Sequence, residues 1–112
     1  MDFSALTARA LAVREGYEEY EQRTYGRPWS LGELRLGLVG DIGDLAKLVQ
    51  AREGVRAIEN AQAKLAHQLA DALWSVIVAA ARCNVDLEGA FVGTMDDLDG
   101  WLARAAESED PA

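Results

Sequence analysis

The sequence predicts an all-α protein with four helices. Apolar residues recur at alternating spacings of three and four in long segments, and no segment shows the strict alternation of a half-buried strand. Short turn signals separate these segments, so consecutive helices should run antiparallel and pack as a compact four-helix domain. At 112 residues, half of them apolar, the chain allows one domain with a modest core. We therefore expect it to form oligomers through its helices.

The first two helices are delimited by a turn and a capping signal. The first covers the initial twenty or so residues, and its expected buried face consists of Phe3, Leu6, Ala10, Val13, Tyr17 and Tyr20. The segment 25–29, Tyr-Gly-Arg-Pro-Trp, ends this helix. Ser30 followed by Glu33 forms a capping box, which predicts a second helix from Leu31 to about Arg52.

The third and fourth helices carry the remaining apolar faces. The third is predicted from about Val55 to Cys83, with Trp74 in the core and a core face of Ile58, Leu65, Leu69, Leu73, Val76 and Ile77. Asp86 is the natural N-cap of the fourth helix. Its shared face is Leu87, Phe91, Met95, Leu98, Trp101 and Leu102, with Trp101 serving packing or an oligomer contact. We expect one domain over residues 1–106 and a frayed or disordered acidic tail over 107–112.

Charge and composition restrict the possible functions. The net charge of −8 argues against sequence-independent nucleic-acid binding, which needs clustered Lys and Arg, and suits attraction of divalent cations. The longest apolar run, residues 72–81, is too short to span a bilayer, and the N-terminus lacks a signal-peptide pattern. The single cysteine, Cys83, cannot form an internal disulfide. We therefore expect a cytoplasmic protein that binds neither membranes nor nucleic acids.

Two carboxylates interrupt the apolar pattern of the second helix. Asp41 and Asp44 are three residues apart, so they project within roughly 60° of each other on one helix face. The apolar seam of this helix consists of Leu34, Leu38, Leu45 and Leu48, and Asp41 occupies its missing position. An ionised carboxylate in such a seam costs several kcal/mol unless a cation, a hydrogen-bond donor or a proton compensates it. The pattern therefore indicates a binding site.

The third helix offers matching donors. Gln68 and Asp71 are also three residues apart, and antiparallel packing would bring them opposite Asp41 and Asp44 in one cleft. Carboxylate and amide oxygens are the ligands that Mg²⁺ prefers, so these four residues are candidate metal ligands. In the alternative interpretation the carboxylates are merely solvated, and Asp71 pairs with His67 on the helix surface.

Two segments resemble a known family of enzymes. GLVGDIGDLAKLVQ and, further along, QLADALWSVIVAAARCNVDLEGAF are similar to the MazG-like all-α nucleotide pyrophosphohydrolases, whose fingerprint is E-x-x-E, a spacer and E-x-x-D. The resemblance covers about Tyr25 to Met95 and is most specific in the L-A-D-x-L-W run. It implies a helical protomer that forms a homo-oligomer, either a dimer or a dimer of dimers. The implied activity is Mg²⁺-dependent hydrolysis of a nucleoside triphosphate to the monophosphate and pyrophosphate, with Mn²⁺ as an alternative metal.

The fingerprint assigns roles to the acidic positions. Asp41 and Asp44 stand where the family has its first two glutamates, Gln68 where it has the third, and Asp71 where it has the aspartate. The resemblance thus implies Asp41, Asp44 and Asp71 as catalytic residues and all four side chains as metal ligands. Each aspartate has an arm one methylene shorter than glutamate, and Gln68 removes about one unit of negative charge because an amide is neutral.

The resemblance also implies substrate contacts. Tyr25 and Trp29 lie in the loop where related enzymes place aromatic residues that sandwich a base, and Lys47 is a nearby cation for phosphate. Where family members carry Lys, Asn and Arg after the V-D-L turn, this chain has Thr-Met-Asp-Asp-Leu-Asp at 94–99. Two interpretations follow: a nucleoside triphosphate pyrophosphohydrolase, or a relative without hydrolysis that persists as a nucleotide-binding or oligomeric interaction protein.

Overall fold

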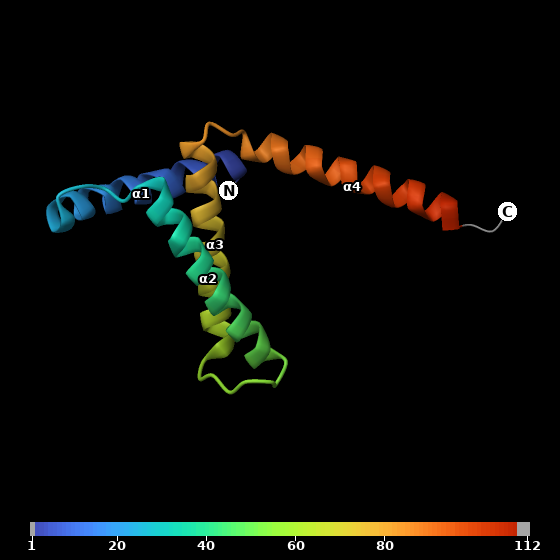
Figure 1. The fold of residues 1–112 in the computed structure, drawn as a ribbon, viewed down its shortest axis with the longest axis horizontal. Helices are drawn as coiled ribbons and strands as arrows, with labels where there is room; N and C mark the ends of the chain where they lie inside the picture. Colours follow the sequence, from blue (N-terminus) through green and yellow to red (C-terminus); the bar gives the residue numbers. More distant parts are fainter. Residues whose placement is uncertain (1, 110–112) are drawn as a thin grey trace.

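Four helices account for most of the chain in the computed structural model (Figure 1). The structure describes residues 2–109, apart from the side chains of Arg35 and Glu109. The helices are α1 (Phe3–Tyr25), α2 (Leu31–Arg52), α3 (Ala61–Arg82) and α4 (Leu87–Glu109), and the described range contains no β-strand. The predicted all-α class and the number of helices are confirmed. No described helix is long and apolar enough to cross a membrane.

The start of α2 follows the predicted capping box. The Ser30 hydroxyl accepts a hydrogen bond from the Glu33 amide at 3.2 Å, and the Glu33 carboxylate accepts one from the Ser30 amide at 3.0 Å. The preceding helix ends at Gly26, whose φ of 81° is readily adopted only by glycine. The loop 26–30 is therefore confined between two well-defined helix ends.

The third helix begins six residues later than predicted. Gly54 adopts a φ of 80°, and the amides of Gly54 and Val55 donate to the carbonyls of Ala51 and Gln50. This Schellman arrangement turns the chain away from the α2 axis. Residues 53–60 consequently form a loop, and α3 starts after Asn60, which has a φ of 55°. The prediction that the helix begins at Val55 and includes Ile58 was therefore wrong.

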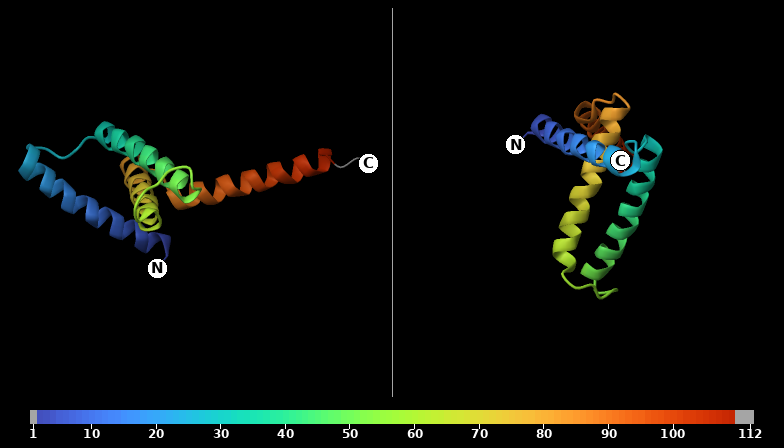
Figure 2. Two further views of the ribbon diagram at one scale, coloured as in Figure 1. Left: turned by 90° about the horizontal axis from the view of Figure 1, so that it is seen from below. Right: turned by 90° about the vertical axis from the view of Figure 1, so that its left-hand side faces the viewer.

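The hairpin of α2 and α3 forms the centre of the structure, and the two helices lie side by side in both views (Figures 1 and 2). Leu48 on α2 and Ile77 and Val78 on α3 are buried. The remaining α3 positions with partial burial on this side are Leu65, Gln68, Ala72, Ser75 and Ala79. These residues are mostly small, which lets the two backbones approach each other.

Part of the predicted core of α3 faces outward. Leu69, Leu73 and Val76 are 52%, 48% and 39% exposed, so their assignment to the core within one chain was wrong. The physical reason is that α2 packs against the neighbouring stripe of small residues. The bulkier residues on the adjacent side of α3 are thereby left exposed in the described part of the chain.

The buried face of α1 is rotated from the predicted one. Leu6, Val13 and Tyr20 are exposed, whereas Arg14 and Glu21 are each only 4% exposed. The helix packs against α3, where the Trp74 indole nitrogen donates a hydrogen bond to the Ala10 carbonyl at 3.0 Å. A periodicity read from apolar residues alone missed this face because charged residues occupy two of its positions.

The fourth helix extends away from the other three (Figures 1 and 2). Its apolar side chains are exposed, among them Phe91 at 61%, Leu98 at 50% and Leu102 at 56%. The radius of gyration is 18.6 Å, whereas a compact chain of this length would have about 13 Å. The prediction that all four helices pack compactly within one chain was wrong. The helix continues to Glu109, past the predicted domain end at residue 106, and the tail residues 110–112 lie outside the described part.

Substitution of valine by alanine at a buried and at an exposed position should separate core from surface. Val78→Ala should lower the free energy of unfolding by about 1–2 kcal/mol, because lost methyl burial outweighs the gain of about 0.5 kcal/mol in helix propensity. Val55→Ala removes the same atoms from a residue that is 74% exposed and should change it by less than about 0.5 kcal/mol. Urea unfolding at fixed protein concentration measures both; equal effects would contradict the packing described here.

Candidate functional site

A cavity between α1, α2 and α3 brings together two of the predicted carboxylates. It has a volume of about 590 Å³ and is lined by Asp41 from α2 and Asp71 from α3. Its other walls are largely aromatic, with Tyr17, Tyr20, Tyr25, Trp29 and Trp74. We call this space the aromatic cavity. The packing of three helices thus surrounds one volume, of a size typical of small-molecule sites, with acidic groups and rings.

Asp41 lies partly buried on the seam of α2, as its position in the leucine pattern predicts. Burial raises the pKa of this carboxyl group, and the negative charges of Asp71 and Asp44 raise it further. Asp44 on the same helix and Asp71 on α3 therefore lie close enough to act on Asp41. A cation bound among them would relieve this repulsion.

The other predicted donors line a neighbouring cavity. This second space of about 470 Å³, which we call the Lys47 cavity, is lined by Asp44, Lys47, His67 and Gln68. The Gln68 Oε1 atom is buried and has no hydrogen-bond partner. His67 borders both cavities, and its Nε2 atom lies 3.2 Å from Asp71 Oδ2, so the predicted surface pair between them is confirmed.

The four predicted metal donors suit a metal ion in chemical type, but they are divided between two cavities. Within residues 2–109, no three His, Cys, Asp or Glu side chains are grouped so that they could hold a metal together. Asp41 and Asp71 share the aromatic cavity, whereas Asp44 and Gln68 line the Lys47 cavity. The oxygen donors suit a hard cation in type and charge. A cation would favour the ionised form of Asp41 and would give the buried Gln68 Oε1 atom a partner. Coordination by all four requires their side chains to converge from two cavities.

Both aromatic residues predicted to contact a base line the aromatic cavity, Trp29 from the 26–30 loop and Tyr25 from the last position of α1, so the prediction that Tyr25 lies in the loop was wrong. Trp29 is 38% exposed and Tyr25 is 59% exposed, so each presents ring surface that a planar ligand could cover. Trp74, which was predicted to lie in the core, is partly buried. Its ring centre lies 5.5 Å from that of Tyr17, and its indole nitrogen donates the hydrogen bond to α1 described above. Trp74 therefore fixes the wall of the cavity.

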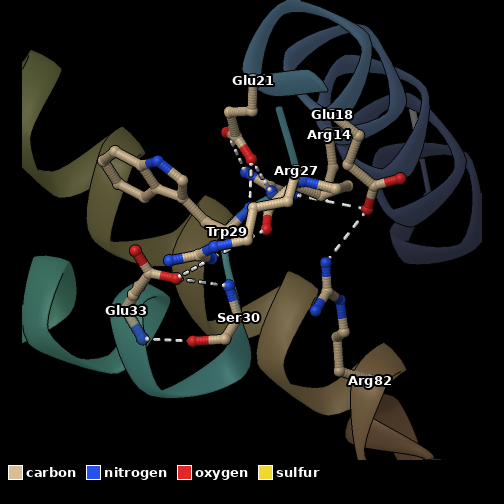
Figure 3. A network of polar contacts seen from close by, with 9 residues as sticks. Arg14, Glu18, Glu21, Arg27, Trp29, Ser30, Glu33 and Arg82 are labelled. Atoms are coloured by element: carbon tan, nitrogen blue, oxygen red, sulfur yellow. Dashed lines mark hydrogen bonds and ion pairs between the residues drawn. The ribbon is translucent and has the colours of Figure 1, made fainter. Parts of the chain in front are cut away.

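A buried ion pair at the edge of the aromatic cavity was missed by the sequence analysis (Figure 3). The Arg14 guanidinium donates to both carboxylate oxygens of Glu21, at 2.6 Å and 2.9 Å, and both residues line the cavity. Glu21 also accepts a hydrogen bond from the Trp29 amide at 2.7 Å. The signal that could have revealed the pair is the spacing of Ala10, Arg14, Tyr17 and Glu21, which places two charged residues on a heptad-like buried face.

Two carboxylates on the helices that flank the 26–30 loop, Glu21 on α1 and Glu33 on α2, are held in their ionised forms. Burial alone would raise the pKa of Glu21, but hydrogen bonds from Arg14 and the Trp29 amide, together with the charges of Arg14 and Arg82, lower it overall. On the outer side, hydrogen bonds from Arg27 and from the Ser30 amide lower the pKa of Glu33 to about 2. Both groups are therefore charged at neutral pH, and each anchors the loop.

The acidic stretch at residues 94–99 does not border either cavity. It lies on α4, which contributes no lining residue to the aromatic cavity or to the Lys47 cavity. Within one chain, its three aspartates therefore do not face a ligand that is bound at Asp41 and Asp71. Lys47 is exposed at the wall of its cavity and is available to an anion there.

Comparison with known proteins finds two curated relatives of part of the chain. dCTP pyrophosphatase 1 of Rattus norvegicus is 41% identical over 68 residues, and dCTP pyrophosphatase 1 of Mus musculus is 38% identical over 68 residues. Each match covers 56% of this chain and 40% of the relative, so the chain spans about two fifths of the length of these proteins. No family profile and no solved structure matches the chain.

Replacement of Asp41 by asparagine should stabilise the protein in the absence of metal. A carboxyl group whose pKa is raised by folding destabilises the native state at neutral pH, and this cost disappears as pH falls below the unfolded-state value of about 4. Asp41→Asn should therefore melt at a higher temperature than the unsubstituted protein at pH 7 in a chelator, and the difference should vanish near pH 4. Thermal melting from pH 7.5 to 4 measures this.

The matched control is Asp97→Asn, which removes a carboxylate from the exposed surface of α4. It should leave the melting temperature nearly unchanged across the same pH range. A lower melting temperature for Asp41→Asn at pH 7 would show that the aspartate is a stabilising structural residue.

Proposed function

We propose that this chain is a nucleotide pyrophosphohydrolase that converts a nucleoside triphosphate to the monophosphate and pyrophosphate with Mg²⁺, or with Mn²⁺ in its place. The observation that carries the proposal is that Asp41 and Asp71 line one cavity together with Trp29 and Tyr25. The similarity to two dCTP pyrophosphatases supports the same reaction class. We expect the protein to act in the cytoplasm.

The base of the substrate lies in the aromatic cavity, and its phosphates lie toward the Lys47 cavity. The rings of Tyr25 and Trp29 stack on the base, because flat aromatic surfaces bind bases without needing hydrogen bonds. The triphosphate extends toward the Lys47 cavity, where the Lys47 ammonium pairs with phosphate oxygens. His67 lines both cavities, so it would lie beside a substrate that reaches from one to the other.

The acidic residues supply the reaction centre. Asp41, Asp44, Asp71 and the Gln68 amide oxygen would hold the cation, which would neutralise phosphate charge and promote attack by water. The carboxylates of Asp41, Asp44 and Asp71 orient that water through hydrogen bonds. Burial and, to a smaller extent, the charges of Asp71 and Asp44 raise the pKa of Asp41, so a bound cation would favour its ionised form.

A second candidate function is nucleotide binding without hydrolysis. It is favoured by two observations: the described residues contain no preassembled group of three metal-binding side chains, and Gln68 provides no charge. Such a protein would bind the same nucleotide through its aromatic cavity and release it unchanged.

Pyrophosphate release across the canonical ribonucleoside and deoxyribonucleoside triphosphates tests the enzymatic proposal. With millimolar Mg²⁺ at least one substrate should be hydrolysed, and Asp41→Asn and Asp71→Asn should each reduce kcat/KM by about 100-fold or more, equivalent to about 2.7 kcal/mol of transition-state stabilisation. Asp97→Asn is the control and should retain full activity. Nucleotide binding in calorimetry without any pyrophosphate release would identify the second candidate, and hydrolysis that survives both substitutions would remove the proposed chemistry.

We further propose that the protein is a homo-oligomer, a dimer or a dimer of dimers, in which α4 packs on a second copy. Most of the stability of a protein helix comes from packing of its amphipathic face, and the apolar face of α4 is exposed within one chain. The exposed apolar faces are Phe91, Met95, Leu98 and Leu102 on α4, and Leu69, Leu73 and Val76 on α3. Because one chain carries both faces, two copies can cover both reciprocally.

Light scattering coupled to gel filtration tests the association. The unsubstituted protein should have at least twice the mass of the 12.1 kDa chain, and Leu98→Glu should shift it toward the monomer with lower helicity in circular dichroism. Val55→Glu, which changes an equally apolar residue of the α2–α3 loop, should leave the mass unchanged. A monomeric protein with fully formed helices would contradict the proposal.

A further inference from the structure

We infer that Glu21 is a positioning residue that fixes Trp29 at the aromatic cavity through the backbone of the 26–30 loop. The inference rests on the proposed function, because it concerns how that cavity receives its substrate. Neither the acidic fingerprint nor the similarity to known proteins assigns any role to Glu21 or to its partner Arg14. It follows from the contacts of a buried carboxylate that joins α1 to the loop.

The contacts of Glu21 use both of its oxygens. Oε1 accepts hydrogen bonds from the Trp29 amide at 2.7 Å and from Arg14 Nη2 at 2.6 Å, and Oε2 accepts from Arg14 Nη1 at 2.9 Å. Figure 3 shows dashed lines from the Glu21 carboxylate to Arg14 and to the backbone of Trp29. Since Arg14 and Glu21 lie two turns apart on one rigid helix, the bidentate pair fixes the carboxylate orientation and hence the position of Trp29.

The energetics of this pair favour a role beyond stability. Two charges that are each 96% buried carry a large desolvation penalty, and an apolar pair of the same size is often equally stable. The Arg14 Nε atom is also buried without a hydrogen bond. An apolar pair, however, could not accept a hydrogen bond from Trp29. The loop attachment is what the charged pair provides and a hydrophobic replacement cannot.

The loop has a second anchor with the same chemistry and a different location. Glu33 accepts hydrogen bonds from Arg27 at 2.6 Å and from the Ser30 amide at 3.0 Å, so it too joins a carboxylate, an arginine and a loop amide. This outer anchor is exposed and does not line the aromatic cavity. It holds the start of α2, whereas the inner anchor holds the residue whose ring faces the ligand. The two glutamates are therefore a matched pair for experiment.

Fixing Trp29 before the ligand arrives lowers the entropic cost of binding. A free loop must be ordered when the base stacks, and that cost subtracts directly from affinity. Loss of the inner anchor should therefore weaken substrate binding and leave the reaction step, which depends on carboxylates of α2 and α3, largely unchanged. The expected signature is a rise in KM with constant kcat.

The test compares Glu21→Gln with Glu33→Gln. Glutamine replaces one acceptor oxygen by an NH2 donor, which repels Arg14 Nη1, and it removes the negative charge that pairs with the guanidinium, so the orientation that holds the Trp29 amide is lost. Glu21→Gln should raise KM about tenfold with kcat within twofold, a change of the size expected for one hydrogen bond to a charged group. Glu33→Gln should leave KM within twofold. Amide exchange at Trp29, followed by NMR, should be faster only in Glu21→Gln.

A double variant keeps the test decisive if Glu21→Gln fails to fold. Arg14→Met with Glu21→Leu replaces the pair by apolar residues of similar size and leaves no unpaired buried charge. It should fold, exchange the Trp29 amide faster and show the same rise in KM. A folded double variant with unchanged KM and unchanged Trp29 exchange would overturn the inference and make the pair purely structural.

The exchange measurement separates this inference from the proposed function. If the unsubstituted protein releases no pyrophosphate but Trp29 exchange responds to Glu21 as described, the anchor holds and the reaction proposal fails. If pyrophosphate is released and neither KM nor Trp29 exchange responds to Glu21, the reaction proposal stands and the anchor does not.

Discussion

The packing of α2 against α3 with a carboxylate on the seam is the constraint on which the rest of the structure depends. Asp41 is partly buried on this seam, and the partly buried positions of α3 include the small residues Ala72 and Ser75, of which Ser75 lines the same cavity as Asp41. The same packing opens the aromatic cavity between the helices and turns Leu69 and Leu73 outward. A site for a charged ligand and an unpartnered apolar surface are therefore two results of one packing arrangement.

The first helix completes the site through polar contacts as well as apolar ones. The Trp74 indole donates a hydrogen bond to a backbone carbonyl of α1, and the buried pair of Arg14 and Glu21 connects α1 to the loop that precedes α2. Hydrogen-bonded attachments of this kind specify a position more sharply than apolar contact, because their strength depends on direction as well as distance. The aromatic wall of the cavity is thus placed by directional bonds, and the acidic wall is placed by helix packing.

Much of this arrangement could be predicted from sequence, and the failures have physical causes. Four helices, the bounds of α2 and the partly buried position of Asp41 follow from local periodicity and capping, which depend on neighbouring residues only. The start of α3 was misplaced because a Schellman turn at Gly54 redirects the chain, and the spacing of apolar residues does not reveal such a turn. The buried face of α1 was misjudged because Arg14 and Glu21 are individually polar and become compatible with burial only as a pair.

The proposed packing of α4 on a second copy has a thermodynamic consequence for the whole protein. A helix whose apolar side is covered only by another molecule contributes to stability in proportion to the supply of that molecule, so mass action enters the folding equilibrium. The midpoint of unfolding then rises with the logarithm of protein concentration, and dilution acts as a denaturant. For a chain built in this way, a stability without a stated concentration has no defined meaning.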